Sequence, residues 1–320
     1  MNGIPGDSQI IGDIPFGRFA NSLATQGILI NVGAATFRAC SNSDLFASQF
    51  QTVYARFPFE DQEQFADIHA QLNRVTGLRR WIRPQVVFLS DGRRPFEPFP
   101  ADTPLPLFEW GCNWMIGQRL NDLLLLHAGA VEKDGLALVL PAVPGSGKST
   151  LTAALSLCGW RLLSDEFGAF DPESSTFRAL LKPVALKNQS IDVIRQFAPH
   201  AVLGPEFPNT RKGTVAHLAA QSDAVAQRHE GARPGAFVLP KWEAGSPTRW
   251  EPLEKGELFG ALAFNAFNYS VQGAVGFQAV AGLVRNCPAW QLVYSDLDDA
   301  LATIDAAWPQ VLEHHAADAQ

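Results

Sequence analysis

The sequence predicts an α/β protein in which a phosphate-binding loop joins a strand to a helix, preceded by a smaller α+β domain. Three observations support this fold class. A glycine-rich loop follows an apolar run of strand length, and a second short strand ends in two adjacent acids. The first third of the chain has no such motifs and is separated from the rest by a proline-rich segment.

The loop at 141–150 reads PAVPGSGKST and fits the end of the G-x-x-x-x-G-K-[ST] pattern that cradles phosphates. Ala142 stands at the first glycine position, so the match differs from the pattern by one small residue. The flanks supply the required context, because 136–140 is an apolar run and 151–158 has helical spacing, ended by Gly159. The alternative is a chance Gly-Ser-Gly turn before an ordinary helix, which this strand–loop–helix context disfavours.

A loop in this place presents free backbone N–H groups and the positive end of the helix dipole to an anion. We therefore expect it to bind the phosphates of ATP, with Lys148 reaching the outer phosphates and the Ser149 hydroxyl binding Mg²⁺. The predicted phosphate-binding residues are Pro144, Gly145, Ser146, Gly147, Lys148, Ser149 and Thr150.

Two adjacent acids, Asp165 and Glu166, follow the short strand predicted at 160–164. We expect this strand and the one before the loop to be parallel neighbours, whose carboxyl ends lie side by side where open α/β sheets bind ligands. A carboxylate there can hold Mg²⁺ or take a proton from an attacking hydroxyl. We expect Ser149 and both acids to share one Mg²⁺, as hard oxygen ligands suit that ion. The alternative is a solvated strand end.

The run LLLLHAGAVEKDGLALVLPAVPGSGKSTLTAALSLCGWRLLSDE resembles the catalytic core of bacterial HPr kinase/phosphorylase, and more distantly that of phosphoenolpyruvate carboxykinase. The runs LKPVALKNQSIDVIR, NTRKGTVAHL and LAFNAFNYS are similar to proteins called HprK-related kinase A. The resemblance covers residues 105–308 and, more weakly, the first third. It implies a P-loop kinase core of the HPr kinase/PEP carboxykinase type, and a homo-oligomer, because HPr kinases are oligomers.

By this resemblance Lys148 and Ser149 match the phosphate lysine and the metal-binding hydroxyl, and Asp165 matches the base that activates the substrate serine. Glu166 matches the second acid near the metal, which is Asp in the family, and His127 matches a histidine on the strand before the loop. The resemblance thus implies Asp165, Lys148 and His127 as catalytic residues. KGTVAHL stands in place of the family's glycine-rich signature, so the resemblance does not extend to HPr as acceptor or to the phosphorylase reaction.

Further cations are candidates for the phosphoryl group. Lys187 precedes a predicted helix, and Arg211 and Lys212 lie in a loop closed by Gly213. Cations there can neutralise charge on a transferring phosphoryl group, and the resemblance favours Lys187 and Lys212 over Arg211. The alternative is that all three are surface residues. For His127, on an apolar strand, the alternative is a buried structural histidine.

The predicted organisation is an accessory α+β domain at 1–104 and a catalytic domain at 105–320. The proline-rich segment 95–106 is the predicted linker. Helical periodicity over 107–120 then leads into a strand that begins at Leu123.

Within the accessory domain the pattern predicts one strand over 27–39, a helix over 45–54, and a strand over 85–89 followed by an Asp-Gly turn. A small basic patch, which we interpret as a solvated face, comprises Arg79, Arg80 and Arg83 beside Trp81.

Composition favours a cytoplasmic enzyme. The 320 residues carry a net charge of −7 with acids and bases mixed, and no basic stripe indicates nucleic acid as a partner. No apolar run reaches the roughly 18 residues of a membrane span, so we expect no membrane association. The N-terminus lacks the basic and apolar regions of a secretory signal, and the four cysteines form no C-x-x-C pair.

The sequence therefore predicts an ATP-dependent kinase that transfers the γ-phosphoryl group to a hydroxyl, serine in our interpretation, of a protein or peptide. Two alternatives remain: a nucleotide-dependent switch that hydrolyses ATP slowly, and a small-molecule kinase. The absence of N-K-x-D and LSGGQ-like segments disfavours a GTPase and a transporter ATPase. Asp165 separates kinase from switch, because only a transfer enzyme needs a base aimed at an acceptor.

Overall fold

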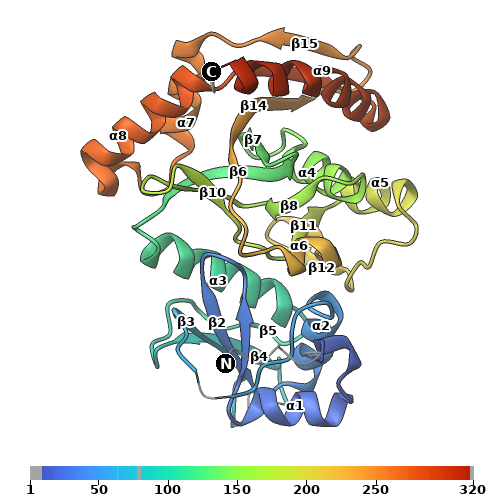
Figure 1. Cartoon of the computed structure of the whole chain (residues 1–320). Helices are drawn as coiled ribbons and strands as arrows, with labels where there is room; N and C mark the ends of the chain where they lie inside the picture. Colours follow the sequence, from blue (N-terminus) through green and yellow to red (C-terminus); the bar gives the residue numbers. More distant parts are fainter. Residues whose placement is uncertain (1–8, 63, 78–80, 318–320) are drawn as a thin grey trace.

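The computed structural model describes residues 9–62, 64–77 and 81–317, and it has a mixed α/β architecture. Figure 1 shows two regions: the N-terminal third surrounds its own sheet, and the rest of the chain surrounds a larger sheet. The buried apolar side chains nevertheless form one continuous core through both regions. Arg79 and Arg80 of the predicted basic patch lie outside the described residues.

The N-terminal region is a five-stranded sheet with helices packed on it. Its described elements are η1 (Ile11–Asp13), α1 (Phe16–Ala24), β1 (Ile28–Asn31), β2 (Thr36–Ser41), α2 (Asp44–Val53), β3 (Ile68–Arg74), β4 (Gln85–Ser90), β5 (Phe99–Pro100) and α3 (Pro104–Arg119). The strand order follows the chain; β2 and β3 are parallel, and the other neighbours are antiparallel. Helix α3, which we assigned to the catalytic domain, packs against β3 and β4.

The prediction of one strand over 27–39 was wrong, because β1 and β2 form a hairpin there. The side chain of Asn31 accepts a hydrogen bond from the Gly33 N–H (2.9 Å), and Gly33 has a φ of 107°. This local turn interrupts the alternating pattern that suggested a single strand. The predictions of α2 and β4 are confirmed, and the segment 95–106 supplies β5 and the first turn of α3 rather than a bare linker.

The larger region is built on an eight-stranded mixed sheet. Its described elements, with those of a smaller sheet, are β6 (Leu124–Lys133), β7 (Leu136–Pro141), α4 (Lys148–Leu157), β8 (Arg161–Ser164), β9 (Phe167–Asp171), β10 (Thr176–Arg178), β11 (Val184–Lys187), α5 (Gln189–Phe197), β12 (Phe207–Thr210), β13 (Gly213–Leu218), α6 (Ser222–Ala226), β14 (Arg233–Trp242), β15 (Arg249–Pro252), α7 (Lys255–Asn265), α8 (Tyr269–Asn286), β16 (Ala289–Tyr294) and α9 (Leu297–Ala317). The order is β10-β9-β6-β7-β14-β16-β15, with β8 also paired to β6.

Strands β7 and β8 are not neighbours, so that prediction was wrong. The long strand β6 lies between them and is antiparallel to both. With ten residues, β6 is long enough to pair with β7 along one edge and with both β8 and β9, one after the other, along the opposite edge. Since β7 and β8 each run opposite to β6, they still point the same way, and their carboxyl ends face the same edge of the sheet.

Helix α4 crosses β6 at Gly129, where a Cβ would collide with the hydroxyl oxygen of Thr152. The absence of a side chain at this position lets the helix that follows the phosphate loop lie directly on the strand. Thr152 in turn donates to the backbone oxygen of Lys148 (2.9 Å). The start of α4 is thereby held against the sheet.

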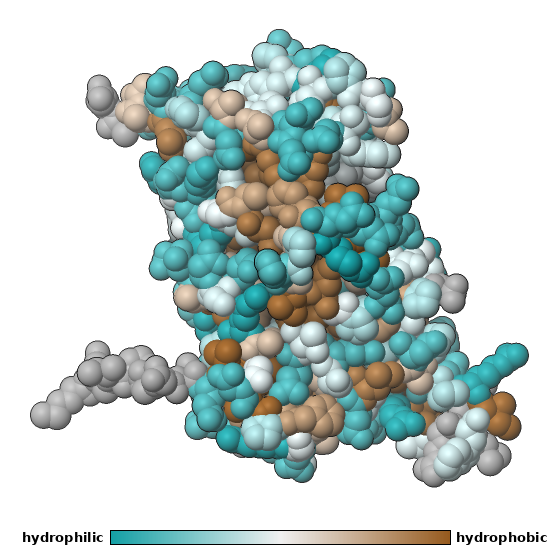
Figure 2. All heavy atoms as spheres, turned by 90° about the vertical axis from the view of Figure 1, so that its right-hand side faces the viewer, coloured by the Kyte–Doolittle hydropathy of each residue, from teal (hydrophilic) through white to brown (hydrophobic). Residues whose placement is uncertain are grey.

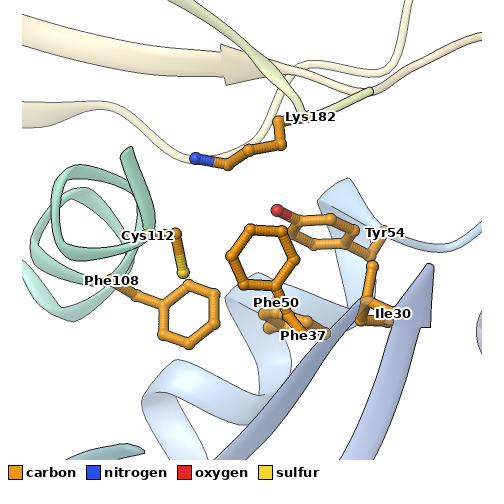
Figure 3. Close-up of a pocket in the computed structure, with 7 residues that line it drawn as sticks. All are labelled: Ile30, Phe37, Phe50, Tyr54, Phe108, Cys112 and Lys182. Carbon is orange, nitrogen blue, oxygen red and sulfur yellow. The ribbon is translucent and has the colours of Figure 1, made fainter. Parts of the chain in front are cut away.

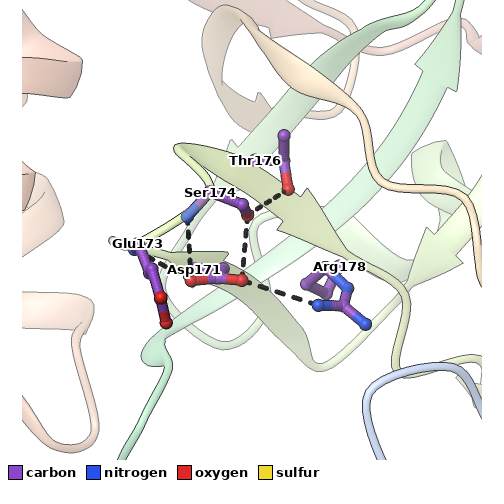
Figure 4. Close-up of polar contacts among 5 residues, drawn as sticks. All are labelled: Asp171, Glu173, Ser174, Thr176 and Arg178. Carbon is purple, nitrogen blue, oxygen red and sulfur yellow. Dashed lines mark hydrogen bonds and ion pairs between the residues drawn. The ribbon is translucent and has the colours of Figure 1, made fainter.

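A polar turn closes the β9–β10 hairpin (Figure 4). The Asp171 carboxylate accepts hydrogen bonds from the backbone N–H groups of Glu173 (2.9 Å) and Ser174 (3.3 Å) and from the Ser174 hydroxyl (2.9 Å). Partial burial raises the pKa of Asp171, but these hydrogen bonds and the Arg178 guanidinium outweigh it and lower the pKa below its ordinary value. The turn is an ordinary, fully paired hairpin end.

Figure 2 shows the side of the molecule that lies on the right in Figure 1, with apolar residues gathered in the middle of the face between polar margins. No helix within the described ranges is both long enough and apolar enough to cross a lipid bilayer.

A buried ion pair joins the two regions. The Lys182 ammonium, on the segment that leads into β11, lies 3.0 Å from a carboxylate oxygen of Glu109 on α3. Figure 3 shows the Lys182 side chain beside Tyr54 and Cys112 of the N-terminal region. The other Glu109 oxygen accepts from the Tyr54 hydroxyl (2.8 Å), and Lys182 also donates to the Asn113 amide oxygen (2.5 Å). Burial, together with the Glu109 charge, raises the pKa of Tyr54, so its hydroxyl stays a donor. The pair ties the strand that carries Lys187 to the N-terminal region.

Lys182→Met is expected to destabilise the protein by about 3–5 kcal/mol, because it leaves the Glu109 carboxylate buried without its partner. The double change Lys182→Met/Glu109→Gln removes both charges and keeps an acceptor for Tyr54, so it is expected to recover most of the loss. Urea unfolding of the three proteins measures this. Equal destabilisation of the single and double variants would contradict it.

Candidate active site

The predicted phosphate loop, residues 141–150, has the backbone that its glycines predict. Gly145 and Gly147 have φ values of 89° and 87°, and Gly147 is the N-cap of α4. The helix begins at Lys148, three residues before the predicted start, and its first turn therefore holds unpaired N–H groups facing the loop. Val143 to Gly145 form the exposed apex of the loop, whereas Ser146 and Lys148 are buried.

The ends of two parallel strands support this loop from the side away from β6. The Trp242 N–H at the end of β14 donates to the Ser146 oxygen (2.9 Å), and the Tyr294 hydroxyl at the end of β16 donates to the Gly147 oxygen (3.2 Å). A Cβ at Gly147 would collide with the Tyr294 hydroxyl. Glycine is therefore required at 147 both for its φ and for this close approach.

Lys148 joins the loop to the acid pair. Its buried ammonium donates a hydrogen bond of 2.5 Å to the backbone oxygen of Asp165. Asp165 and Glu166 occupy a break between β8 and β9, two strands that pair in succession with the same edge of β6. The Ser164 hydroxyl closes this turn by accepting from the Phe167 N–H (3.1 Å). The structure thus brings the loop and the acids together, as the sequence predicts, although β6 separates their strands.

Asp165 is buried, at 6% exposure, and one of its carboxyl oxygens is unpaired: Oδ1 has no hydrogen-bond partner among the described residues. Burial raises the pKa of Asp165, and the Glu166 charge adds to the rise, while the Lys148 ammonium and the nearby Ser149 hydroxyl oppose it. A buried acceptor held in this way costs free energy unless another group pairs with it, which is typical of a reactive site.

Glu166 and His127 are more exposed to solvent than Asp165: their side chains are 34% and 24% exposed. The His127 Nε2 is 3.9 Å from the Glu166 Oε1, which is too long for a hydrogen bond. Burial, together with the Lys148 charge, lowers the pKa of His127, so the imidazole is mainly neutral near pH 7. Burial raises the pKa of Glu166, but the positive charges around it, foremost Lys148, outweigh that effect and lower the pKa overall. Glu166 is therefore ionised.

Lys187 is the last residue of β11, and the exposed Lys212 lies in the turn between β12 and β13, at the same end of the small sheet, whose order is β11-β13-β12. Burial lowers the pKa of Lys187, and so does the charge of Lys212, while Glu166 and Asp165 oppose the shift. Both lysines also act on the pKa of His127 and of Glu166. The two predicted cations therefore lie near enough for their charges to act on the acids.

Asn188 aligns the two lysines, and sequence reasoning missed it. It has a φ of 51°, its N–H donates to the Thr214 oxygen (2.9 Å), and its side-chain oxygen accepts from the Thr214 N–H (3.1 Å). These bonds join the residue after Lys187 to the strand after Lys212. The available signal was the residue type, because Asn adopts a positive φ more often than most residues other than glycine.

Arg211 does not join this group. Its exposed guanidinium lies 5.9 Å from the ring centroid of Phe99, in the N-terminal region. This agrees with the preference for Lys187 and Lys212 as the functional cations.

Aromatic residues border the acid side of the site. Phe267 is 52% exposed, and its ring centroid lies 5.5 Å from that of His127 and 5.1 Å from that of Phe167. Asn268, within the run LAFNAFNYS, fixes this corner by accepting from the Leu125 N–H (3.0 Å). Asn268 is therefore a packing residue, and Phe267 is an exposed neighbour of the acids.

The side chains present fit ATP and Mg²⁺. Mg²⁺ in phosphoryl-transfer sites is bound by one or two carboxylates together with substrate phosphates, and Ser149, Asp165 and Glu166 offer such hard oxygen ligands. Within the described ranges, no group of three or more His, Cys, Asp or Glu side chains is placed so that it could hold a metal ion by itself, so a metal here would depend on Ser149 and the phosphates as well. Asp165 Oδ1 and Ser146 Oγ are both buried without a partner in the described part of the chain, which leaves polar atoms for a ligand.

No family model matches this chain, and no curated protein matches it. The functional conclusion therefore rests on the geometry of the site and on the motifs that the sequence carries.

Gly147→Ala is expected to destabilise the protein by more than the roughly 1–2 kcal/mol that a left-handed backbone costs a non-glycine residue, because the methyl group also meets Tyr294. Gly145→Ala is the matched control: its φ is the same, but nothing lies within 4 Å of the added Cβ. Urea unfolding compares the two. Tyr294→Phe should reduce the excess cost at 147, and an equal cost at both glycines would count against the steric account.

Proposed function

We propose that this chain is an ATP-dependent kinase with a P-loop core of the HPr kinase type, which transfers the γ-phosphoryl group of ATP to a serine hydroxyl of a protein or peptide. The observation that carries the proposal is the contact between Lys148 and Asp165. It places the lysine of a phosphate loop and a buried carboxylate with a free oxygen in one site. Phosphoryl transfer needs this pairing of phosphate binding and proton acceptance.

The phosphate loop binds the donor. The N–H groups of the first turn of α4 and the helix dipole attract the phosphates, and the Lys148 ammonium meets the outer two. Lys187 and Lys212 offset the charge on the three oxygens of the moving group. Mg²⁺ held by Ser149 and Glu166 would neutralise charge on the β- and γ-phosphates.

The acid pair divides the remaining work. Asp165 takes the proton of the acceptor hydroxyl, whose oxygen forms a bond to the γ-phosphorus as the bond from that phosphorus to the β-bridging oxygen breaks and ADP leaves. Glu166, kept ionised by the surrounding cations, stays with the metal. His127, neutral near pH 7, lies beside Glu166 without adding a further positive charge.

Two observations support a polypeptide acceptor and a transfer reaction over the alternatives. The exposed aromatic side chain of Phe267 (52%) packs against His127 and Phe167, next to the acids, and such a surface suits a peptide better than a small polar molecule. The buried Asp165 with an unpaired oxygen suits a base, whereas a switch needs only the metal site and a water. Composition adds a cytoplasmic location to the proposal, and the resemblance adds a homo-oligomer.

Lys148→Ala is expected to weaken ATP–Mg binding and abolish transfer, because the ammonium no longer meets the β- and γ-phosphates. Titration calorimetry with ATP–Mg measures the affinity. Lys241→Ala, which removes an exposed lysine that pairs with Glu243, is the control and should bind as the unchanged protein does. Unchanged affinity in Lys148→Ala would rule out the phosphate-loop assignment.

Asp165→Asn is expected to bind ATP–Mg within a few-fold of the unchanged protein and to lose about a hundred- to ten-thousand-fold in transfer, because it removes the base but keeps the shape. The acceptor is sought by incubation with extracts and labelled ATP, followed by mass spectrometry. Transfer at the original rate would exclude Asp165 as the base.

The pH profile gives a second readout of Asp165. A base acts in its deprotonated form, so the rate falls as pH falls through its pKa; because burial raises that pKa, the fall begins at a higher pH than for an exposed aspartate. The residual rate of Asp165→Asn should not show this fall at low pH. The variant should be at least as stable as the unchanged protein at neutral pH, because it removes a buried charge.

A further inference from the structure

The proposed site fixes the direction of the bound nucleotide. The acids and lysines that serve the γ-phosphate lie on the β6–β8–β9 side of the phosphate loop. An extended triphosphate whose γ end lies there must point its nucleoside toward the opposite side. On that side, β14 and β16 run parallel to β7, so their carboxyl ends meet the same edge of the sheet. Ligands of open α/β sheets bind at this edge.

An exposed tryptophan stands at that place. Trp242 is the last residue of β14 and 46% exposed, although its backbone touches the loop through the bond to Ser146. The Cβ of Trp242 lies 3.0 Å from the position that a Cβ on Gly147 would take. Its indole N–H donates to the Ser295 oxygen just beyond β16 (3.3 Å). The Trp242 residue is therefore anchored by its backbone at the loop and by its indole N–H just beyond the end of β16.

The loop does not need this side chain. The hydrogen bond to Ser146 comes from the backbone N–H of residue 242, which every residue except proline supplies. The neighbouring bond from the Glu243 N–H to the Tyr294 oxygen (2.8 Å) is likewise a backbone bond. Support of the loop therefore leaves the half-exposed indole unexplained, and large exposed aromatic rings beside a ligand site offer a stacking surface.

We propose that the indole of Trp242 is the platform on which the base of the donor nucleotide stacks. This inference rests on the proposed function, and it assigns the nucleoside end of the site, which neither the phosphate-loop motif nor the acid pair specifies. A π-face recognises any base by stacking, so Trp242 supplies affinity for a nucleoside and not a choice among bases. The bond to Ser295 orients the ring before the nucleotide binds, which lowers the entropy cost of binding.

The test compares two ligands that share the triphosphate, of which only ATP carries a nucleoside. Titration calorimetry measures ATP–Mg and inorganic tripolyphosphate–Mg with the unchanged protein and with Trp242→Ala, Trp242→Phe and Trp114→Ala. Trp114 is a tryptophan of similar exposure (41%) on α3, in the N-terminal region, and serves as the matched control.

The expected result is that Trp242→Ala binds ATP–Mg about ten- to a hundredfold more weakly, as for the loss of a base–aromatic stack, and binds tripolyphosphate–Mg within about twofold. Trp242→Phe should restore most of the ATP affinity, and Trp114→Ala should change neither ligand. An equal loss for both ligands in Trp242→Ala, or no loss for ATP, would overturn the inference while leaving the phosphate loop intact. If the unchanged protein binds neither ligand, the proposed function falls, and the inference falls with it.

Discussion

The hydrogen bond from Lys148 to the backbone oxygen of Asp165 is the contact on which the site depends. It joins the first residue of α4 to the turn between β8 and β9, across the intervening strand β6. Gly129 makes this possible, because α4 can lie directly on β6 only where no side chain intervenes. A glycine on one strand and a lysine on one helix therefore determine where the phosphate loop meets the acids.

The electrostatics of the site follow from placing several charges in a partly buried volume. Burial alone disfavours every charged form, so it raises the pKa of Asp165 and lowers those of His127 and Lys187. The cations around Glu166 outweigh burial, and its pKa falls instead. Two adjacent carboxyl groups thus acquire opposite pKa shifts, and in the proposed kinase this difference would separate the proton acceptor from the metal ligand. The difference comes from their surroundings rather than from their residue types.

The N-terminal region takes part in this arrangement at a distance. Lys182, tied to Glu109 of α3, lies on the segment that becomes β11, and β11 ends at Lys187. Asn188 then joins that end to the strand after Lys212. A continuous path of hydrogen bonds and covalent chain therefore leads from α3 to the two lysines of the site. Because buried ion pairs contribute little net stability, we infer that the Lys182–Glu109 pair serves mainly to fix the position of β11 relative to α3.

The sequence by itself determined the local features of this protein: the strand–loop–helix around Lys148, the glycines of the loop, the helix α2, and the turn after β4. These depend on short-range periodicity and on backbone preferences, which a few neighbouring residues specify. The sequence also identified the residues that gather at the site, because a lysine after a glycine-rich turn and an acid pair after a short strand have few other uses.

Only the tertiary structure decided how those pieces are paired. An apolar run such as β6 fits between two strands as well as beside one, so its position between β7 and β8 was not readable from the chain. The same holds for the contacts of Gly147 with Tyr294 and of Ser146 with Trp242, which join residues about 100–150 positions apart in the sequence. Such contacts depend on the packing of whole strands, and no local pattern encodes them.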